Sequence, residues 1–545
     1  MDLQKPKYNW TSISLVLLLI IGFGLQIYFL YFGYIYYGYL VSPGGDVVPH
    51  LNMAESVLKN GLSLKAGYPP LFHFIVVKLS QMFNVDILHI LSFWTPILAV
   101  MPAMSMYFLL RQIFDQKIST ISTLILLLTS QYPLFAFVDG NYPDMLAYGV
   151  FAILLFGFVI RYYKTQKIAN LVIALALLIL IAFTHNLTFV SVLTILVLFG
   201  LLQIILTYRE HGIVFDWKKI TIFSLVILTL GISVYFAFKM YGGLAVGFIS
   251  GVINNKAYLA DDFLNKTPDF TIYPSVMGNL VWYLGLTGLM FVLVSSFTKT
   301  VNIKTKQLVI IWFLFYFLLS RISSVGVPAR FARELAPPLI ICIGFLLNGV
   351  FSIEAKKHRF GLFAAYGLIG FLIITNSALY SGLLRLPEGF KSMVWFTKVD
   401  QQKVDYIKSE TNNQDIILYN QRANQFTPIK LENQLQPLEL TKEEIDVVKN
   451  FQKNEAFQVD IDLLVSKKTK QYKDISYIFV DKKPSTNPDE KVYPNYANYE
   501  QYSIALEQMA KGGEVVKTFS DGASLVKVDF NRNNNQSKNK YYLDE

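Results

Sequence analysis

Long apolar runs dominate the first 385 residues and set the fold class. Many of them reach about 18 residues or more, the length that a helix needs to cross a bilayer. The chain is 53% hydrophobic and 16% charged, with a mean hydropathy of +0.41, whereas about a quarter of the residues of a soluble domain are charged. The sequence therefore predicts a polytopic α-helical membrane protein.

The apolar runs predict about eleven transmembrane helices. We expect them at residues 13–38, 90–110, 118–137, 144–160, 168–184, 187–207, 219–240, 277–297, 307–322, 335–352 and 361–383. Segment 69–84 is apolar but short and contains Lys78, so we expect it to lie at the interface. The basic connections then share one side with the N-terminal lysines, as the positive-inside rule requires. This orientation predicts a plasma-membrane protein with a cytoplasmic N-terminus and an extracytoplasmic C-terminal part.

Residues 386–545 are more polar and predict a separate unit. We expect an extracytoplasmic α/β or α+β domain over residues 386–530 and a disordered tail over 531–545. Its expected strands are 415–419, 475–480, 514–519 and 524–530, and its expected helices lie near 400–410, 440–452 and 499–511. The last two strands flank the turn sequence SDGA and predict a hairpin.

Charge and cysteine content exclude some classes of function. The net charge of +10 arises in residues 1–385, where positive-inside anchoring accounts for it. No basic stripe with interleaved aromatics is present, which argues against a nucleic-acid partner. The single cysteine, Cys342, lies in an apolar run and cannot form an intrachain disulfide.

An early acidic residue follows the first apolar run. Gly44 and Gly45 allow a tight turn, and Asp46 then precedes a segment that can form a helix on the membrane surface. Asp46 is either an N-cap of that helix or a general base at the lipid–water boundary. His50, four residues later, would face the same side.

Three further clusters fall on the expected outer face. Asp139 and Asp144 flank a turn, where Asp144 either caps the next helix or, with Asp139 and Asp46, holds a divalent cation such as Mg or Mn. Arg330 and Arg333 lie near a helix N-terminus, where cations are disfavoured and anions are attracted, so they predict a phosphate site. Arg321 and Glu334 are further substrate-binding candidates beside them. The alternative is that the arginines snorkel to the membrane surface or pair with Glu334. His185, in the turn between two apolar runs, is a further substrate-binding candidate.

The order and sidedness of these motifs resemble the GT-C superfamily of membrane glycosyltransferases. The matching pieces are Gly44-Gly45-Asp46, Tyr68-Pro69-Pro70-Leu71, Asp139 through Asp144, and Arg330-Phe331-Ala332-Arg333. The resemblance covers about residues 10–385 in layout. It implies a transmembrane catalytic domain over residues 1–385 with a first outer loop over 41–89. By this resemblance Asp46 is the catalytic base, and Asp139 and Asp144 help to bind metal or acceptor. The soluble part has no WWDYG-like motif, which argues against an oligosaccharyltransferase acting on asparagine.

The resemblance implies transfer of a hexosyl or pentosyl group from a polyprenyl-phosphate-linked donor to a glycan, protein or lipid acceptor. Asp46 would deprotonate the acceptor hydroxyl, and a single displacement would invert the anomeric carbon. A polysaccharide polymerase or ligase would instead use Arg330, Arg333 and His185. A transporter or flippase of lipid-linked sugars would use the arginines, although transporters place buried charges near the bilayer midplane and often contain repeats.

Overall fold

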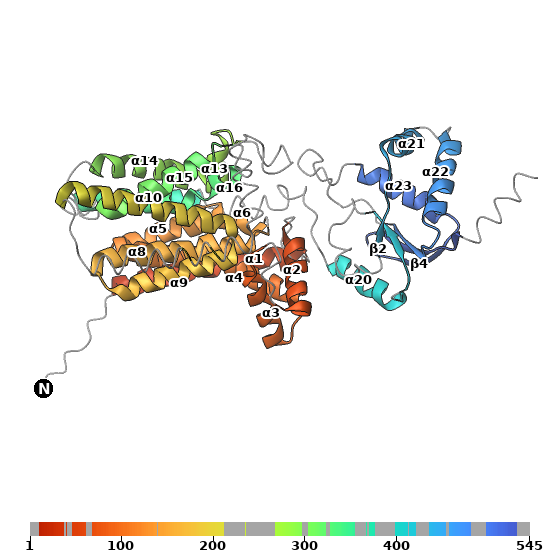
Figure 1. Ribbon diagram of the computed structural model, residues 1–545, viewed down its shortest axis with the longest axis horizontal. Coiled ribbons are helices and arrows are strands. Elements are labelled where there is room, and N and C mark those ends of the chain that lie inside the picture. The colour runs from red at the N-terminus through yellow and green to blue at the C-terminus, as the bar shows by residue number, and fades with distance from the viewer. Residues whose placement is uncertain are drawn as a thin grey trace, which may run out of the picture. The chain divides into compact units, whose positions relative to one another are not determined.

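The computed structural model describes most of the helical part and most of the C-terminal part (Figure 1). The described residues are 10–37, 40, 46–61, 68–138, 140–211, 231, 235, 267–296, 303–322, 328–354, 367, 370–375, 398–412, 414–420, 435–453, 457–480 and 498–530. The chain divides into two compact units. The first comprises Met1–Gly33 and Met53–Leu386, and the second comprises Tyr34–Asn52 and Pro387–Glu545.

The first unit is helical, and its long helices run side by side (Figure 1). Its described helices are α1 (Trp10–Tyr37), α2 (Val47–Asn60), α3 (Leu71–Phe83), α4 (Ile87–Ile113), α5 (Gln116–Thr129), α6 (Tyr132–Val138), α7 (Tyr142–Asp144), the π-helix η1 (Met145–Ala152), α8 (Ile153–Thr165), α9 (Ile168–Thr184), α10 (Asn186–His211), α13 (Ile272–Met277), α14 (Asn279–Ser296), α15 (Ile303–Leu319), α16 (Pro328–Arg333) and α17 (Ala336–Glu354). Two of these helices, α1 and α2, also run into the residues of the second unit.

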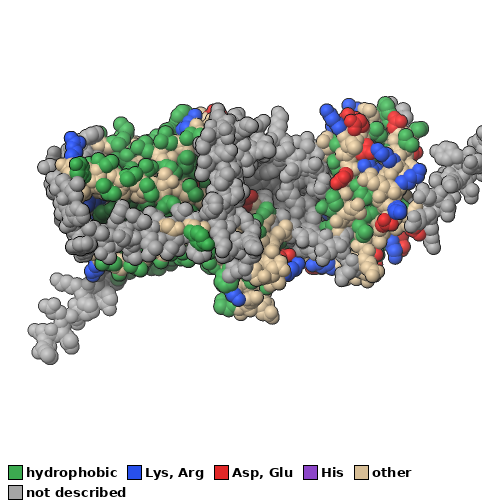
Figure 2. Space-filling model, in the orientation of Figure 1, with side chains coloured by type: hydrophobic (Ala, Val, Ile, Leu, Met, Phe, Trp, Pro, Cys, Tyr) green, Lys and Arg blue, Asp and Glu red, His purple; other side chains and the backbone are tan. Residues whose placement is uncertain are grey.

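Among the described residues, four stretches are long and apolar enough to cross a membrane: Ile87–Ile113, Tyr142–Thr165, Asn186–Arg209 and Pro328–Phe351. Several shorter apolar helices accompany them, including Ile168–Thr184. The described side chains on the visible face of this unit are largely hydrophobic (Figure 2), as expected for helices that contact lipid. The protein is thus a multi-pass membrane protein, while the number of eleven spans stays a prediction.

Close packing of small residues brings some helices together. A Cβ atom on Gly288 of α14 would lie 2.4 Å from the carbonyl oxygen of Cys342 in α17. One on Gly149 of η1 would lie 2.6 Å from Pro102 Cγ in α4. Glycines allow such approach where helices pack inside a membrane. Gly149 thereby lets η1, which follows Asp144 directly, pack closely against α4.

The expected helix boundaries hold for most segments and fail for one. The expected span at 118–137 is interrupted, because α5 ends at Thr129 and α6 begins at Tyr132. Segment 69–84 forms α3, whose 13 residues are too short to cross a bilayer. Most of the expected span 219–240 and most of 361–383 lie outside the described residues.

The second unit contains a five-stranded sheet of order β2-β1-β3-β5-β4. The strands are β1 (Ile417–Tyr419), β2 (Leu435–Pro437), β3 (Tyr477–Val480), β4 (Glu514–Thr518) and β5 (Ser524–Lys527). The pairs β1–β2 and β1–β3 are parallel, and the pairs β3–β5 and β4–β5 are antiparallel. This mixed sheet and its helices confirm the expected α/β or α+β character.

Helices cover both faces of this sheet. The helices are α20 (Lys398–Glu410), α21 (Lys442–Lys453), α22 (Gln458–Gln471) and α23 (Tyr499–Ala510). Because side chains alternate along a strand, Ile417 and Tyr477 pack with α20, whereas Leu418 and Ile478 pack with the other three helices. The unit therefore has three layers.

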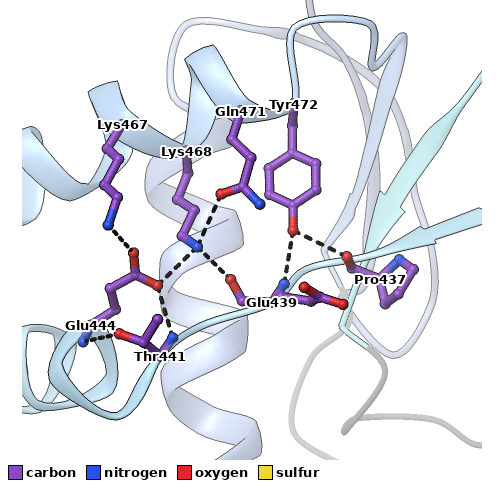
Figure 3. A network of polar contacts seen from close by, with 8 residues as sticks. All are labelled: Pro437, Glu439, Thr441, Glu444, Lys467, Lys468, Gln471 and Tyr472. Atoms are coloured by element: carbon purple, nitrogen blue, oxygen red, sulfur yellow. Dashed lines mark hydrogen bonds and ion pairs between the residues drawn. The ribbon is translucent and has the colours of Figure 1, made fainter.

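A polar network joins α21 to α22 in this unit (Figure 3). Glu444 accepts from Lys467 at 2.8 Å and pairs with Lys468 at 2.8 Å. Its other contact closes a capping box, because Thr441 N donates to Glu444 Oε2 at 2.8 Å. Burial opposes the ionisation of Glu444, but these hydrogen bonds prevail and lower its pKa to about 2.

Candidate functional site

Three segments that are distant in the sequence meet at one buried cluster in the first unit. Asp144 ends α7 at the start of η1. His185 separates α9 from α10, and Thr188 lies in the first turn of α10. Arg330 and Arg333 lie in the last turn of α16. The cluster therefore gathers the ends of several membrane helices.

Asp144 lies at the centre of the cluster and is fully buried. Its Oδ1 accepts a hydrogen bond of 2.7 Å from the Thr188 hydroxyl and lies 3.4 Å from His185 Nδ1. Its Oδ2 lies 3.5 Å from Arg333 Nη2. A buried carboxylate needs such partners to stay ionised, so both oxygens face donors or cations.

The expectation that Asp144 caps the next helix is wrong. Its side chain makes no capping hydrogen bond to η1 and instead bonds across to α10. The helix after Asp144 is also unusual, because residues 145–152 are π-helical. Such segments are rare and are frequent at functional sites.

His185 and Thr188 contact each other at the start of α10. His185 Nδ1 lies 2.8 Å from Thr188 Oγ1, and the backbone N–H of Thr188 lies 3.3 Å from the same ring nitrogen. The Tyr68 ring packs edge-on against the His185 ring, with centroids 6.3 Å apart. Asp144, Thr188 and His185 thus form one hydrogen-bonded group under an aromatic side chain.

Asn141 binds both arginines. Its side-chain amide oxygen, oriented towards the guanidinium groups, accepts from Arg330 Nη2 at 2.9 Å and Nε at 3.0 Å, and from Arg333 Nη2 at 3.1 Å. Arg333 is buried, whereas Arg330 is partly exposed. The pair therefore combines one enclosed cation with one that solvent reaches.

The arginines end the short helix α16 and precede α17, which begins at Ala336. They thus lie near the N-terminus of a long helix, as expected from the sequence, where the helix dipole disfavours cations and attracts anions. Glu334 follows Arg333 directly and is buried; its backbone carbonyl accepts from the Tyr148 hydroxyl. Trp312 Nε1 donates to that hydroxyl at 3.0 Å. This tyrosine–tryptophan pair fixes the backbone at the end of the arginine motif.

The remaining predicted site residues are Asp46, His50, Asp139 and Arg321. Asp46 and His50 belong to the second unit, where His50 N donates to the Asp46 carbonyl at 3.3 Å and starts α2. Asp139 lies outside the described residues. Arg321 donates to the carbonyl of Pro268 and stacks on Phe270, 4.8 Å from the ring centroid. That Asp46 and Asp139 share a site with Asp144 stays a prediction.

Thr188, Asn141 and His73 were not singled out from the sequence as site residues. The Thr188 hydroxyl links Asp144 to His185, and the Asn141 amide oxygen links Arg330 to Arg333. His73 is buried, and its ring lies 5.8 Å from that of Tyr68. A polar residue one helical turn after His185 was the available signal for Thr188.

Each oxygen of Asp144 already has a donor or a cation near it. Among the described residues, no group of three or more His, Cys, Asp or Glu side chains could hold a metal ion. A divalent cation on Asp144 at about 4 Å from the Arg333 guanidinium would meet a repulsion of roughly 8 kcal/mol at an effective dielectric constant of 20. Hard cations take six or more oxygen ligands, whereas Asp144 contacts the Thr188 hydroxyl and the Arg333 guanidinium, with Glu334 as a second carboxyl group beside it.

Solved structures of other proteins share the fold of this chain. Neither the protein-family models nor the curated proteins gave a match. Among solved structures, the apo oligosaccharyltransferase of Archaeoglobus fulgidus is 12% identical with a TM-score of 0.56, covering 96% of this chain and 74% of that one. ArnT of Cupriavidus metallidurans bound to undecaprenyl phosphate is 12% identical with a TM-score of 0.53, covering 95% and 98%.

The chain has the GT-C fold. The resemblance inferred from the motif order is thus confirmed at the level of fold. AglB of A. fulgidus, in complex with an inhibitory peptide and a dolichol-phosphate, is 11% identical with a TM-score of 0.58 over 96% of this chain and 75% of that one. A further structure of the A. fulgidus enzyme is a complex with Zn and sulfate.

Proposed function

We propose that the protein is an integral-membrane glycosyltransferase. It moves a hexosyl or pentosyl group from a polyprenyl-phosphate-linked donor to a glycan, protein or lipid acceptor on the extracytoplasmic face. The observation that carries the proposal is the buried Asp144–His185–Arg333 cluster at the ends of membrane helices in a chain with the GT-C fold. Charged groups at membrane depth are costly and mark functional sites.

Arg330 is the group that we assign to the donor phosphate. It is partly exposed and shares the neutral Asn141 with Arg333. A guanidinium group suits phosphate oxygens because its N–H groups form a planar fork. Neighbours with this fold were solved with dolichol-phosphate and with undecaprenyl phosphate, which supports a lipid-phosphate ligand.

Asp46 is the proposed general base. It would take a proton from an acceptor hydroxyl as that oxygen attacks the anomeric carbon, while the bond from that carbon to the phosphate oxygen breaks. The phosphate leaves as an anion near Arg330, so it needs charge stabilisation more than protonation. A single displacement predicts inversion at the anomeric carbon. Asp46 and Asp139 also stay candidates for a divalent cation such as Mg or Mn.

A second function is favoured by one specific observation. His185 lies in the same cluster as Arg333, through Asp144, and a polysaccharide polymerase or ligase would use His185 with the two arginines. The two functions differ in the residue that activates the acceptor. Asp46 performs that step in the first and His185 in the second.

Transfer assays in purified membranes test both functions. Membranes with the wild-type protein, with His185→Gln, and without the protein receive a panel of radiolabelled polyprenyl-phosphate sugars. We expect protein-dependent formation of a labelled product together with free polyprenyl phosphate, and residual transfer in His185→Gln. No transfer from any donor would contradict the glycosyltransferase assignment for this panel. Loss of transfer in His185→Gln with preserved folding and donor binding would favour the polymerase or ligase.

A further inference from the structure

We propose that Arg333 is the resident counter-ion of Asp144 and occupies the place that a divalent cation would hold at this carboxylate. The pairing is a property of the resting protein, so it stands or falls separately from glycosyl transfer. It also separates the two arginines of the motif. Arg333 is a positioning residue for Asp144, whereas Arg330 is the partly exposed arginine that the proposed function assigns to the donor phosphate.

The burial of both partners is the first argument. Asp144 is 0% exposed and Arg333 is 4% exposed. Arginine and aspartate are almost never fully buried unless they are paired, and an unpaired charge at this depth is strongly unfavourable. Arg333 Nη2 lies 3.5 Å from Asp144 Oδ2, so each side chain supplies the opposite charge that the other needs.

The orientation of Arg333 is the second argument. Asn141, three residues before Asp144, accepts from the same Nη2 atom at 3.1 Å. The guanidinium is therefore held between an amide oxygen and a carboxylate oxygen of one short segment. Oδ1 is in turn bound by the Thr188 hydroxyl at 2.7 Å. A metal ion on either oxygen would have to displace one of these contacts.

The chemistry of the surrounding groups is the third argument. Asp144 faces a guanidinium, an imidazole nitrogen and a hydroxyl donor, and the buried Glu334 carboxyl group lies beside it. A divalent cation requires several oxygen ligands that accept no competing proton. The positive charge next to the Asp144 carboxylate is thus the Arg333 guanidinium group. The sequence expectation that Asp144 ligates a metal ion is replaced by this pairing.

A double-mutant cycle on the full chain in detergent tests the pairing. The variants are Asp144→Asn, Arg333→Gln and the double variant, measured by reversible unfolding. Each single variant removes one partner of the Arg333–Asp144 pair, whereas the double variant removes both. We expect the double variant to be more stable than the additive value by roughly tenfold to a hundredfold in the unfolding equilibrium constant. Additive effects would overturn the proposal.

Mn²⁺ binding, followed by electron paramagnetic resonance, tests the absence of a metal ion at Asp144. We expect the number of Mn²⁺ ions bound to the wild type to be unchanged in the double variant. Loss of a bound Mn²⁺ ion on removal of the carboxylate would overturn the proposal. If the Gln and Asn variants do not fold, Arg333→Lys decides, because lysine keeps the charge. It should fold and gain no Mn²⁺; failure to fold would show that a counter-ion role is not sufficient.

Discussion

Thr188→Val removes one hydroxyl from the centre of the cluster and keeps the shape of the side chain. The hydroxyl donates to Asp144 Oδ1 at 2.7 Å and lies 2.8 Å from His185 Nδ1. A hydrogen bond to a charged group contributes about 1.5–3 kcal/mol. Because Asp144 is fully buried, water cannot replace the lost donor. We therefore expect a loss of about 2 kcal/mol, or roughly 30-fold in the unfolding equilibrium constant.

The assay is reversible unfolding of the full chain in detergent, with Thr184→Val as the matched control. The Thr184 hydroxyl bonds at 2.6 Å to the Leu180 carbonyl of its own helix, and such a bond adds little to helix stability. We expect the control to lie within about 0.5 kcal/mol of the wild type. Equal effects of the two substitutions would refute the reasoning, because the contact across the helices would then carry no free energy.

Two further predictions concern other parts of the chain. Glu444 has a pKa lowered to about 2 from 4.5 in the folded state, so its stabilising effect is full above pH 4.5 and is lost as the pH falls towards 2. Hydrogen exchange of α21 and α22, corrected for intrinsic rates, should show about 1–2 kcal/mol of acid weakening in the wild type and less in Glu444→Gln; parallel curves would contradict it. Gly278 has a φ of +94°, and a Cβ atom there would lie 2.1 Å from the Thr129 carbonyl oxygen. Gly278→Ala should lower stability by more than about 2 kcal/mol in the same unfolding assay, whereas Gly200→Ala, with open space around it, should not.

The sequence predicted those helices whose two ends are marked by polar residues. The expected span 168–184 coincides with α9, because Lys167 and His185 flank a run that is almost entirely apolar. The break between α5 and α6 was missed because its residues, Thr129 to Gln131, are also tolerated inside membrane helices. Apolar content alone therefore could not locate it.

In the second unit, too, some elements were predicted from the sequence and others were missed. The expected strands 415–419 and 475–480 contain β1 and β3, since each is a short run of β-branched and aromatic residues. Strand β2 was missed because it has three residues and ends in Pro437. Helix α22 was missed because its apolar residues do not mark its buried face. Val459 and Leu463 are apolar, yet they are 76% and 72% exposed.

The site was predicted as separate pieces and not as a cluster. Each acid, histidine and arginine motif was recognised from its position between apolar runs, but sequence spacing does not say which helix ends meet. Asp144 was expected in a polar loop, yet tertiary packing buries it between Thr188 and Arg333. The linking roles of Asn141 and Thr188 depend on these long-range contacts and could not be read from local patterns.

The most direct test of the central claim is glycosyl transfer by Asp46→Asn. Asparagine caps a helix about as well as aspartate, so the substitution removes the base and keeps the start of α2. Asp86→Asn is the matched control, because Asp86 is an exposed acid that precedes α4 and lies 3.6 Å from His89. We expect Asp46→Asn to lose transfer while folding and donor binding persist, and Asp86→Asn to transfer like the wild type. Unchanged transfer in Asp46→Asn would contradict the role of Asp46 as general base and leave it as a helix cap.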